Sequence, residues 1–100
     1  MGPGFEWDEA KAQTNLEKHG ISFPEAATVF ADPLAAIFPD ADHSGEELRE
    51  IIVGNSERNR LLIVSFTERG ANLRIISARA ATPRERKEFE DNPMGGSKHE

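Results

Sequence analysis

Only a few of the side-chain types in this sequence can transfer protons or bind anions. There is no cysteine and no tyrosine, so nucleophilic or acid–base chemistry falls to histidines, carboxylates, lysines and arginines. The three histidines, His19, His43 and His99, lie far apart, and none has a partner at the spacing of metal ligands. The sequence also lacks a glycine-rich phosphate loop and a dinucleotide-binding fingerprint. We therefore expect no metal site and no cofactor.

Basic residues are concentrated in the second half of the chain. Residues 58–87 hold eight basic and two acidic residues, and seven of the eight are arginines, whose planar fork suits phosphate. Residues 1–50 hold three basic and eleven acidic residues, within a net charge of −6. This asymmetry indicates an anionic partner for one surface, and ion pairing between the two halves is the alternative.

Two of these arginines lie in a predicted strand from Asn72 to Arg79. Arg74 and Arg79 are five residues apart, so on an unbulged strand they point to opposite faces of the sheet, with Ala78 on the Arg74 face. Beside the small Ser77 and Ala78, Arg79 is placed to bind a phosphate through two hydrogen bonds. The alternative is that Arg79 ends the strand and pairs with an acid of the first half.

A helix is predicted before these strands, with Asp8 as its N-cap and Gly20 as its left-handed stop. Its polar stripe consists of Lys11, Asn15 and Lys18. At its end, His19 either caps the helix by bonding local carbonyls or titrates near neutral pH. In the second half, Glu68 beside Arg69 is either a carboxylate at a hairpin end or a general base for a ribose 2′-hydroxyl.

The order of the predicted helices and strands that carry these residues indicates an α+β fold. We expect two N-terminal helices, an antiparallel β-meander of about four strands and a C-terminal helix. Their expected bounds are 9–18 and 23–30 for the first helices, 34–38, 48–54, 61–67 and 72–79 for the strands, and 83–91 for the last helix. We expect one domain over 5–91, flexible ends at 1–4 and 92–100, no membrane span and a cytoplasmic protein.

The order of several short motifs resembles one known family. The opening Phe5-Glu6-Trp7-Asp8, followed by Lys11, Asn15, Lys18-His19-Gly20 and Phe23, resembles the start of the BrnT toxins. The match continues through Asp42-His43-Ser44, Arg60-Leu61-Leu62, Thr67-Glu68-Arg69-Gly70 and Arg74-Ile75-Ile76-Ser77-Ala78-Arg79, then Thr82, Arg84 and Glu85. The similarity covers about 5–91. Each piece is weak alone, but the ordered set is specific.

This resemblance implies a toxin of a type II toxin–antitoxin pair, with a fold similar to RelE-like ribonucleases. Such a protein cleaves RNA without a metal, inhibits translation and growth, and is neutralised by a BrnA-type antitoxin, in an expected heterotetramer. DNA is then contacted only through the antitoxin. The alternatives are a non-catalytic protein-interaction module and an inactive toxin that acts only as a co-repressor.

Site residues follow from combining this expectation with the chemistry of RNA cleavage. We expect Arg79 to stabilise the phosphate, His19 to act as acid, Lys18 to give electrostatic support and Glu68 to act as base. The expected RNA-binding residues are Arg60, Arg69, Arg74 and Arg84. The hypothesis requires Arg60, Arg74 and Arg79 to converge on one uncovered face of the sheet.

Overall fold

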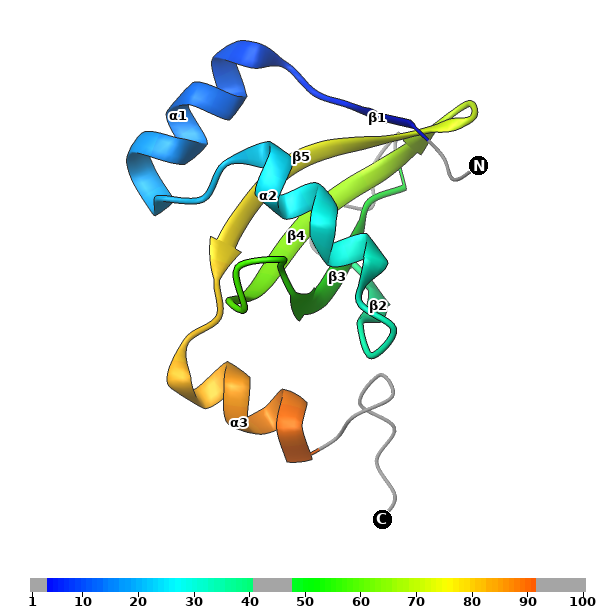
Figure 1. Ribbon diagram of the computed structural model, residues 1–100. Coiled ribbons are helices and arrows are strands. Elements are labelled where there is room, and N and C mark those ends of the chain that lie inside the picture. Colours follow the sequence, from blue (N-terminus) through cyan, green and yellow to red (C-terminus); the bar gives the residue numbers. More distant parts are fainter. Residues whose placement is uncertain (1–3, 41–47, 92–100) are drawn as a thin grey trace.

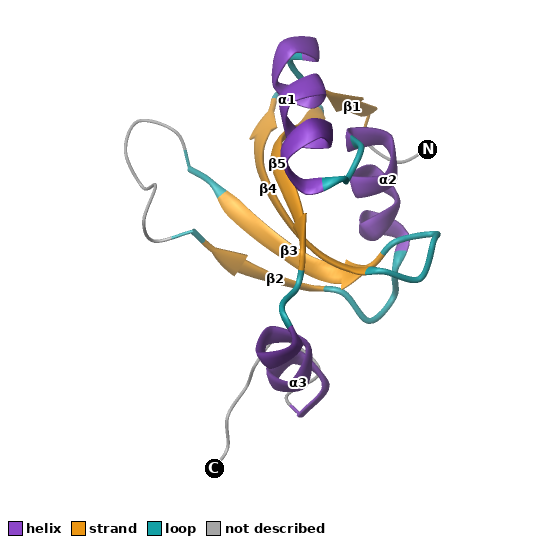
Figure 2. Ribbon diagram, turned by 90° about the vertical axis from the view of Figure 1, so that its left-hand side faces the viewer, coloured by secondary structure: helices purple, strands orange, loops and turns teal. Residues whose placement is uncertain are grey.

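A five-stranded mixed sheet forms the centre of the fold, and two helices cover one of its faces (Figures 1 and 2). The computed structural model describes residues 4–40 and 48–91, so His43, His99 and most of the expected flexible ends lie outside the described residues. The elements in chain order are β1 (Gly4–Glu6), α1 (Glu9–His19), α2 (Phe23–Thr28), the 3₁₀ helix η1 (Val29–Ala31), β2 (Ala36–Pro39), β3 (Glu50–Asn55), β4 (Leu61–Arg69), β5 (Asn72–Ala80) and α3 (Pro83–Asp91).

The predicted starts of the first two helices and the stop at Gly20 are confirmed, whereas α2 ends at Thr28, before the predicted residue 30, and is followed by η1. Asp8 caps α1 by accepting a hydrogen bond from the Lys11 backbone N–H at 3.1 Å. Gly20 ends the helix at φ +72°, a left-handed conformation that glycine adopts without steric cost. Ser22 caps α2 in the same way, through the Glu25 backbone N–H.

The predicted meander is confirmed, but the sheet has one more strand than the sequence indicated. Strands β2, β3, β4 and β5 pair antiparallel in that order. At the far edge, β1 pairs parallel to β5, with Phe5 beside Leu73 and Glu6 beside Arg74. Gly4 was expected in a flexible end and instead begins this strand. A three-residue strand has no period of its own to detect, and it forms because β5 offers it a free edge.

The core lies between the sheet and the layer formed by α1, α2 and η1. Phe23 and Val29 from the helices are fully buried against Leu62, Val64 and other aliphatic residues of the strands. Aromatic contacts extend the core toward β1, since Phe30 stacks edge-on against Phe66 at 4.9 Å and lies 5.2 Å from Phe5. Both α1 and α2 pack on β5, so residues of this strand lie next to α1.

A β-bulge in β5 overturns the expected alternation of its side chains. Ser77 pairs with Ser65, and Ile75 pairs with Phe66, which leaves Ile76 as the extra residue. Arg79 therefore pairs opposite Ile63, and Arg74 opposite Thr67, two residues that share one face of β4. The prediction that Arg74 and Arg79 point to opposite faces is wrong. Both lie on the face opposite the helices, while Ile75 and Ala78 lie in the core.

The last helix stands apart from the two layers. α3 follows the end of β5 and contains no buried residue (Figure 2). Its start is a capping box, in which Thr82 Oγ1 accepts from the Glu85 N–H and the Glu85 carboxylate accepts from the Thr82 N–H. Within the described residues, no helix has the length and apolar character needed to cross a membrane.

Candidate active site

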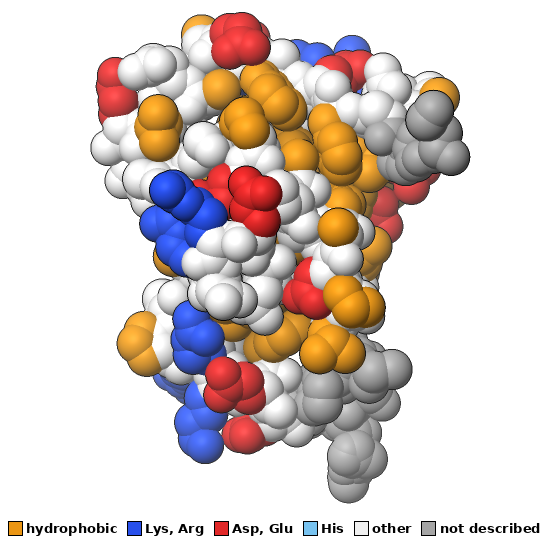
Figure 3. All heavy atoms as spheres, in the orientation of Figure 1, with side chains coloured by type: hydrophobic (Ala, Val, Ile, Leu, Met, Phe, Trp, Pro, Cys, Tyr) orange, Lys and Arg blue, Asp and Glu red, His pale blue; other side chains and the backbone are white. Residues whose placement is uncertain are grey.

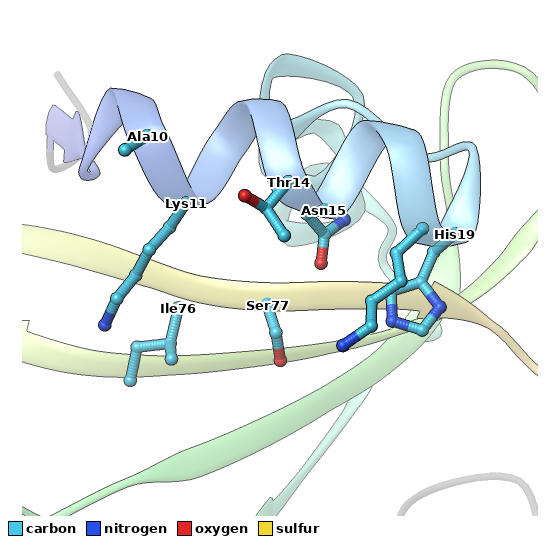
Figure 4. A pocket seen from close by; sticks show the side chains of 8 residues that line it. Ala10, Lys11, Thr14, Asn15, His19, Ile76 and Ser77 are labelled. Carbon is cyan, nitrogen blue, oxygen red and sulfur yellow. The ribbon is translucent and has the colours of Figure 1, made fainter.

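A groove runs between α1 and the edge of β5. β1 covers only the first part of that edge, and α1 lies along the rest (Figure 1). The groove has a volume of about 310 Å³, in the range of small-ligand pockets. It is lined by Ala10, Lys11, Thr14, Asn15, Lys18 and His19 of α1 and by Ile76 and Ser77 of β5. Figure 4 shows Lys11 at one end of the groove and His19 at the other, both over β5.

Asn15 fixes α1 against this edge. Its side-chain amide donates to the Ala78 carbonyl and to the Ile21 carbonyl, at 2.9 Å each, and its oxygen accepts from the Ala78 N–H at 3.1 Å. The side chain thus takes the place of a neighbouring strand for Ala78 and is buried. Because Asn15 is in the middle of the predicted polar stripe, its hydrogen bonds determine how Lys11 and Lys18 face β5.

The basic side chains of the groove have no acidic partner among the described residues. Within residues 4–40 and 48–91, no ion pair or side-chain hydrogen bond involves Lys11, Lys18 or His19. The helix cap is made by the Gly20 backbone N–H, which bonds the Leu16 carbonyl at 2.9 Å, and not by the His19 ring. Two ammonium groups and an imidazole therefore face one hollow, beside the hydroxyls of Thr14 and Ser77. Such an arrangement is suited to an anion.

Arg60 has a different role from the expected one. It lies directly before β4 and turns toward the helices, where its Nε donates to Glu25 at 2.9 Å. Glu25 is 4% exposed and also accepts from the Ser56 hydroxyl at 2.7 Å. Arg60 therefore joins α2 to the β3–β4 turn, and the expectation that it converges with Arg74 and Arg79 is wrong.

Arg74 and Arg79 share the uncovered face, but each is held by a carboxylate. Arg74 donates to Glu6 of β1 at 2.9 Å. Arg79 makes a two-pronged contact with Glu85 of α3, 2.8 Å for each prong. The ion-pairing interpretation thus holds for Arg60 and Arg74, whose partners belong to the first half, whereas the partner of Arg79 follows it in the chain. Figure 3 shows basic and acidic side chains lying beside one another on the helix side as well.

These contacts lower the pKa of the carboxylates. The hydrogen bonds from Arg79, followed by that from the Thr82 backbone, lower the pKa of Glu85 to about 2. Those from Arg60 lower the pKa of Glu25, although burial opposes them. The Asn72 amide and then Arg74 lower the pKa of Glu6. All three carboxylates are therefore ionised at neutral pH. Each balances the positive charge of the arginine that it holds.

The remaining predicted site residues are not gathered at the groove. Glu68 lies near the end of β4 and pairs across from Leu73, about 15 Å along the sheet from Ala78. Arg69 occupies the next position, at the β4–β5 turn. Arg84 is on α3, 90% exposed, and 3.7 Å from Glu88. Of the expected catalytic set, the structure brings Lys18 and His19 together and places Glu68 elsewhere.

Sequence reasoning missed two residues that shape the site. Lys11 was assigned only to a polar stripe, although its spacing of seven from Lys18 already placed both on one side of the helix. For Glu25, no signal in the sequence indicated that its carboxylate is buried against Arg60. In the described part of the chain, no three histidine or acidic side chains lie together in the manner of metal ligands.

Comparisons with known proteins agree with this architecture. The model of one protein family, described as "Ribonuclease toxin, BrnT, of type II toxin-antitoxin system", matches residues 7–85. No curated protein matches the sequence. Among solved structures, the ribonuclease toxin BrnT of Brucella abortus is similar, with 29% identity and a TM-score of 0.63 over 80% of this chain and 97% of that one. The chain belongs to the family of BrnT ribonuclease toxins of type II toxin–antitoxin systems.

Proposed function

We propose that this chain is an endoribonuclease toxin that cleaves RNA without a metal, in the groove between α1 and β5. The observation that supports this most directly is the pair of lysines in the groove, Lys11 and Lys18, which like the neighbouring His19 have no ion pair or side-chain hydrogen bond within residues 4–40 and 48–91. A phosphodiester is the anion that a ribonuclease must bind, and cations aimed at its oxygens stabilise the charge that develops during cleavage.

In the proposed reaction, the ribose 2′-oxygen attacks the phosphorus atom and the bond from phosphorus to the 5′-oxygen breaks. His19 accepts the proton of the 2′-hydroxyl and delivers it to the leaving 5′-oxygen, since histidine is the side chain that exchanges protons most readily near neutral pH. Lys18 stabilises the phosphorane. The products are a 2′,3′-cyclic phosphate and a 5′-hydroxyl. Glu68 is too distant to be the base in this arrangement.

Arg79 can bind the RNA phosphate only after its guanidinium has released Glu85. It follows Ser77 and Ala78 on β5 and lies on the face of the sheet opposite the helices, where Glu85 occupies both prongs of its guanidinium. An RNA phosphate competes for the same two donors. We propose that Arg79 joins the phosphate when it leaves Glu85, and that Arg69, Arg74 and Arg84 contribute only to general attraction of the RNA.

The test is cleavage of a single-stranded RNA in excess EDTA by the purified chain and by matched variants. Replacing His19 by Ala removes acid–base catalysis and is expected to slow cleavage by at least about 100-fold. Lys18→Ala is expected to slow it as well, whereas Lys87→Ala, which removes an exposed lysine of α3, should leave it unchanged. Equal residual cleavage by the wild type and His19→Ala, or loss of cleavage in EDTA, would contradict the proposal.

Membership in this family implies an antitoxin partner. We propose that the partner is of the BrnA type, that the two form a heterotetramer, and that DNA is bound only through the antitoxin. The chain acts in the cytoplasm and slows growth when it is expressed alone. Co-expression with a BrnA-type antitoxin should restore growth and give a complex of that stoichiometry by native mass spectrometry.

One observation favours the alternative of an inactive toxin that serves as a co-repressor. Arg60, Arg74 and Arg79 are all engaged by carboxylates, so the predicted phosphate ligands are occupied. In that case the wild type would not slow growth or cleave RNA, yet it would still strengthen binding of the antitoxin to its operator. This outcome separates the two functions.

A further inference from the structure

Lys11 lies at the opposite end of the groove from His19. Figure 4 shows its side chain extending from α1 toward β5 beside Ile76. Residues 11 and 18 are seven apart, which in an α-helix is two turns and a rise of about 10.5 Å. The reaction proposed above needs Lys18 and His19 at one end of the groove. It gives no task to a second ammonium group two turns away.

The lining between the two lysines is suited to a strand of sugar and phosphate. Thr14 and Ser77 line the middle of the groove, with the Ser77 hydroxyl directed away from α1, and Ala10 and Ile76 supply apolar surface at the Lys11 end. Asn15 leaves no free amide there, because its three hydrogen bonds are used to hold α1. The hollow is bounded by one helix and one strand edge, which accommodates a single strand more readily than a duplex.

The separation of Lys11 and Lys18 determines which phosphates of the RNA each of them contacts. The helix rises about 10.5 Å between the two residues, which is longer than one extended sugar–phosphate repeat, and the Lys11 side chain lies at the opposite end of the groove from His19 (Figure 4). It is available for a phosphate further along the same strand. No carboxylate within the described residues competes for Lys11, in contrast to Arg74 and Arg79.

We infer that Lys11 binds a second phosphate of the RNA, about two nucleotides from the scissile one, and that single-stranded RNA runs along α1 through the groove. This inference rests on the proposed ribonuclease function for the identity of the ligand. It adds a positioning residue and a minimum length of substrate. Substrates too short to reach Lys11 bind without contacting it, whereas longer substrates bind with higher affinity because they do contact it.

Binding of uncleavable RNA tests this independently of catalysis. The probes are 2′-O-methyl oligonucleotides of two to eight nucleotides, titrated by fluorescence anisotropy at several KCl concentrations. The proteins are the wild type, Lys11→Ala, Lys11→Gln and the control Lys87→Ala. Because Lys11 uses only its backbone N–H to complete the α1 cap, both Lys11 variants retain that cap.

Wild type and Lys87→Ala should bind the longer oligonucleotides more tightly than the dinucleotide, and both Lys11 variants should lose most of that gain. Removing one phosphate contact to a single strand should also lower the slope of log affinity against log salt by about 0.7. In cleavage of long RNA, Lys11→Ala should raise KM with kcat nearly unchanged. A duplex of the same length should bind more weakly.

An equal effect of Lys11→Ala on the dinucleotide and on longer strands would overturn the inference, as would an unchanged salt slope or preference for the duplex. If the wild type cleaves no RNA but length-dependent binding still requires Lys11, the ribonuclease proposal fails and the path of the strand stands. If cleavage requires His19 but not Lys11 at any length, the function stands and this inference fails.

Discussion

Replacing Asn15 by Ala tests the contact that forms the groove. The change leaves three backbone groups without a partner, the N–H and carbonyl of Ala78 and the carbonyl of Ile21. An unsatisfied buried group costs about 1–3 kcal/mol, and we take the lower value because the adjacent groove admits water. The better helix propensity of alanine returns up to about 0.7 kcal/mol. The expected net loss is about 2.5 kcal/mol, a large share of the roughly 5–15 kcal/mol of a domain this size.

The assay is urea and thermal unfolding of both Asn15→Ala and Gln13→Ala. At about 4–8 °C per kcal/mol, the melting temperature of Asn15→Ala should fall by about 10–20 °C. Gln13 is an exposed amide on the same helix, bonded to Glu17 at 3.0 Å, so its variant should stay within about 0.5 kcal/mol of wild type. RNA cleavage by Asn15→Ala, measured well below its melting temperature, should also fall. A stability equal to that of Gln13→Ala would refute the reasoning.

Three further outcomes follow from the ion pairs. The pKa of Glu85 is lowered from 4.5 to about 2, so its charged form stabilises the fold above about pH 4.5, and this contribution is lost as pH falls toward 2. The free energy of unfolding of Glu85→Gln, measured in urea, should therefore fall less than that of the wild type as the pH is lowered from about 4.5 to 2. Identical pH profiles of the two proteins would contradict this. The same variant frees Arg79 and should bind and cleave RNA more strongly at low salt, whereas Glu85→Gln combined with Arg79→Ala should not. A double-mutant cycle of Glu25→Gln and Arg60→Ala should show a favourable coupling between the two side chains, and a coupling near zero would contradict the pairing.

Local signals in the sequence were sufficient for most of the elements. Capping residues and a left-handed glycine act through the backbone within a few positions, so Asp8 and Gly20 marked the ends of the first helix correctly. The antiparallel meander followed from short connections, which exclude a parallel crossover. The strand β1 gave no such signal because its three residues are ordered by the free edge of β5.

The arrangement of the site depended on contacts that sequence spacing does not contain. The bulge at Ile76 moved Arg74 to the same face as Arg79, and no residue type near it announces a bulge. Glu25 is 35 positions from Arg60 in the chain, yet their side chains are hydrogen-bonded. Lys18 and His19, by contrast, are neighbours on one helix, and their common position in the groove could be expected from the end of that helix alone.

The central claim is that RNA binds the groove between α1 and β5, with the scissile phosphate at the end of the groove that holds His19. The most direct measurement is an amide NMR titration of the ¹⁵N-labelled chain with a 2′-O-methyl oligonucleotide. The account predicts that the largest shifts occur at Lys11, Lys18, His19 and Ser77. Shifts confined to the opposite face, around Val53 and Ile63, with those of α1 unchanged, would contradict it.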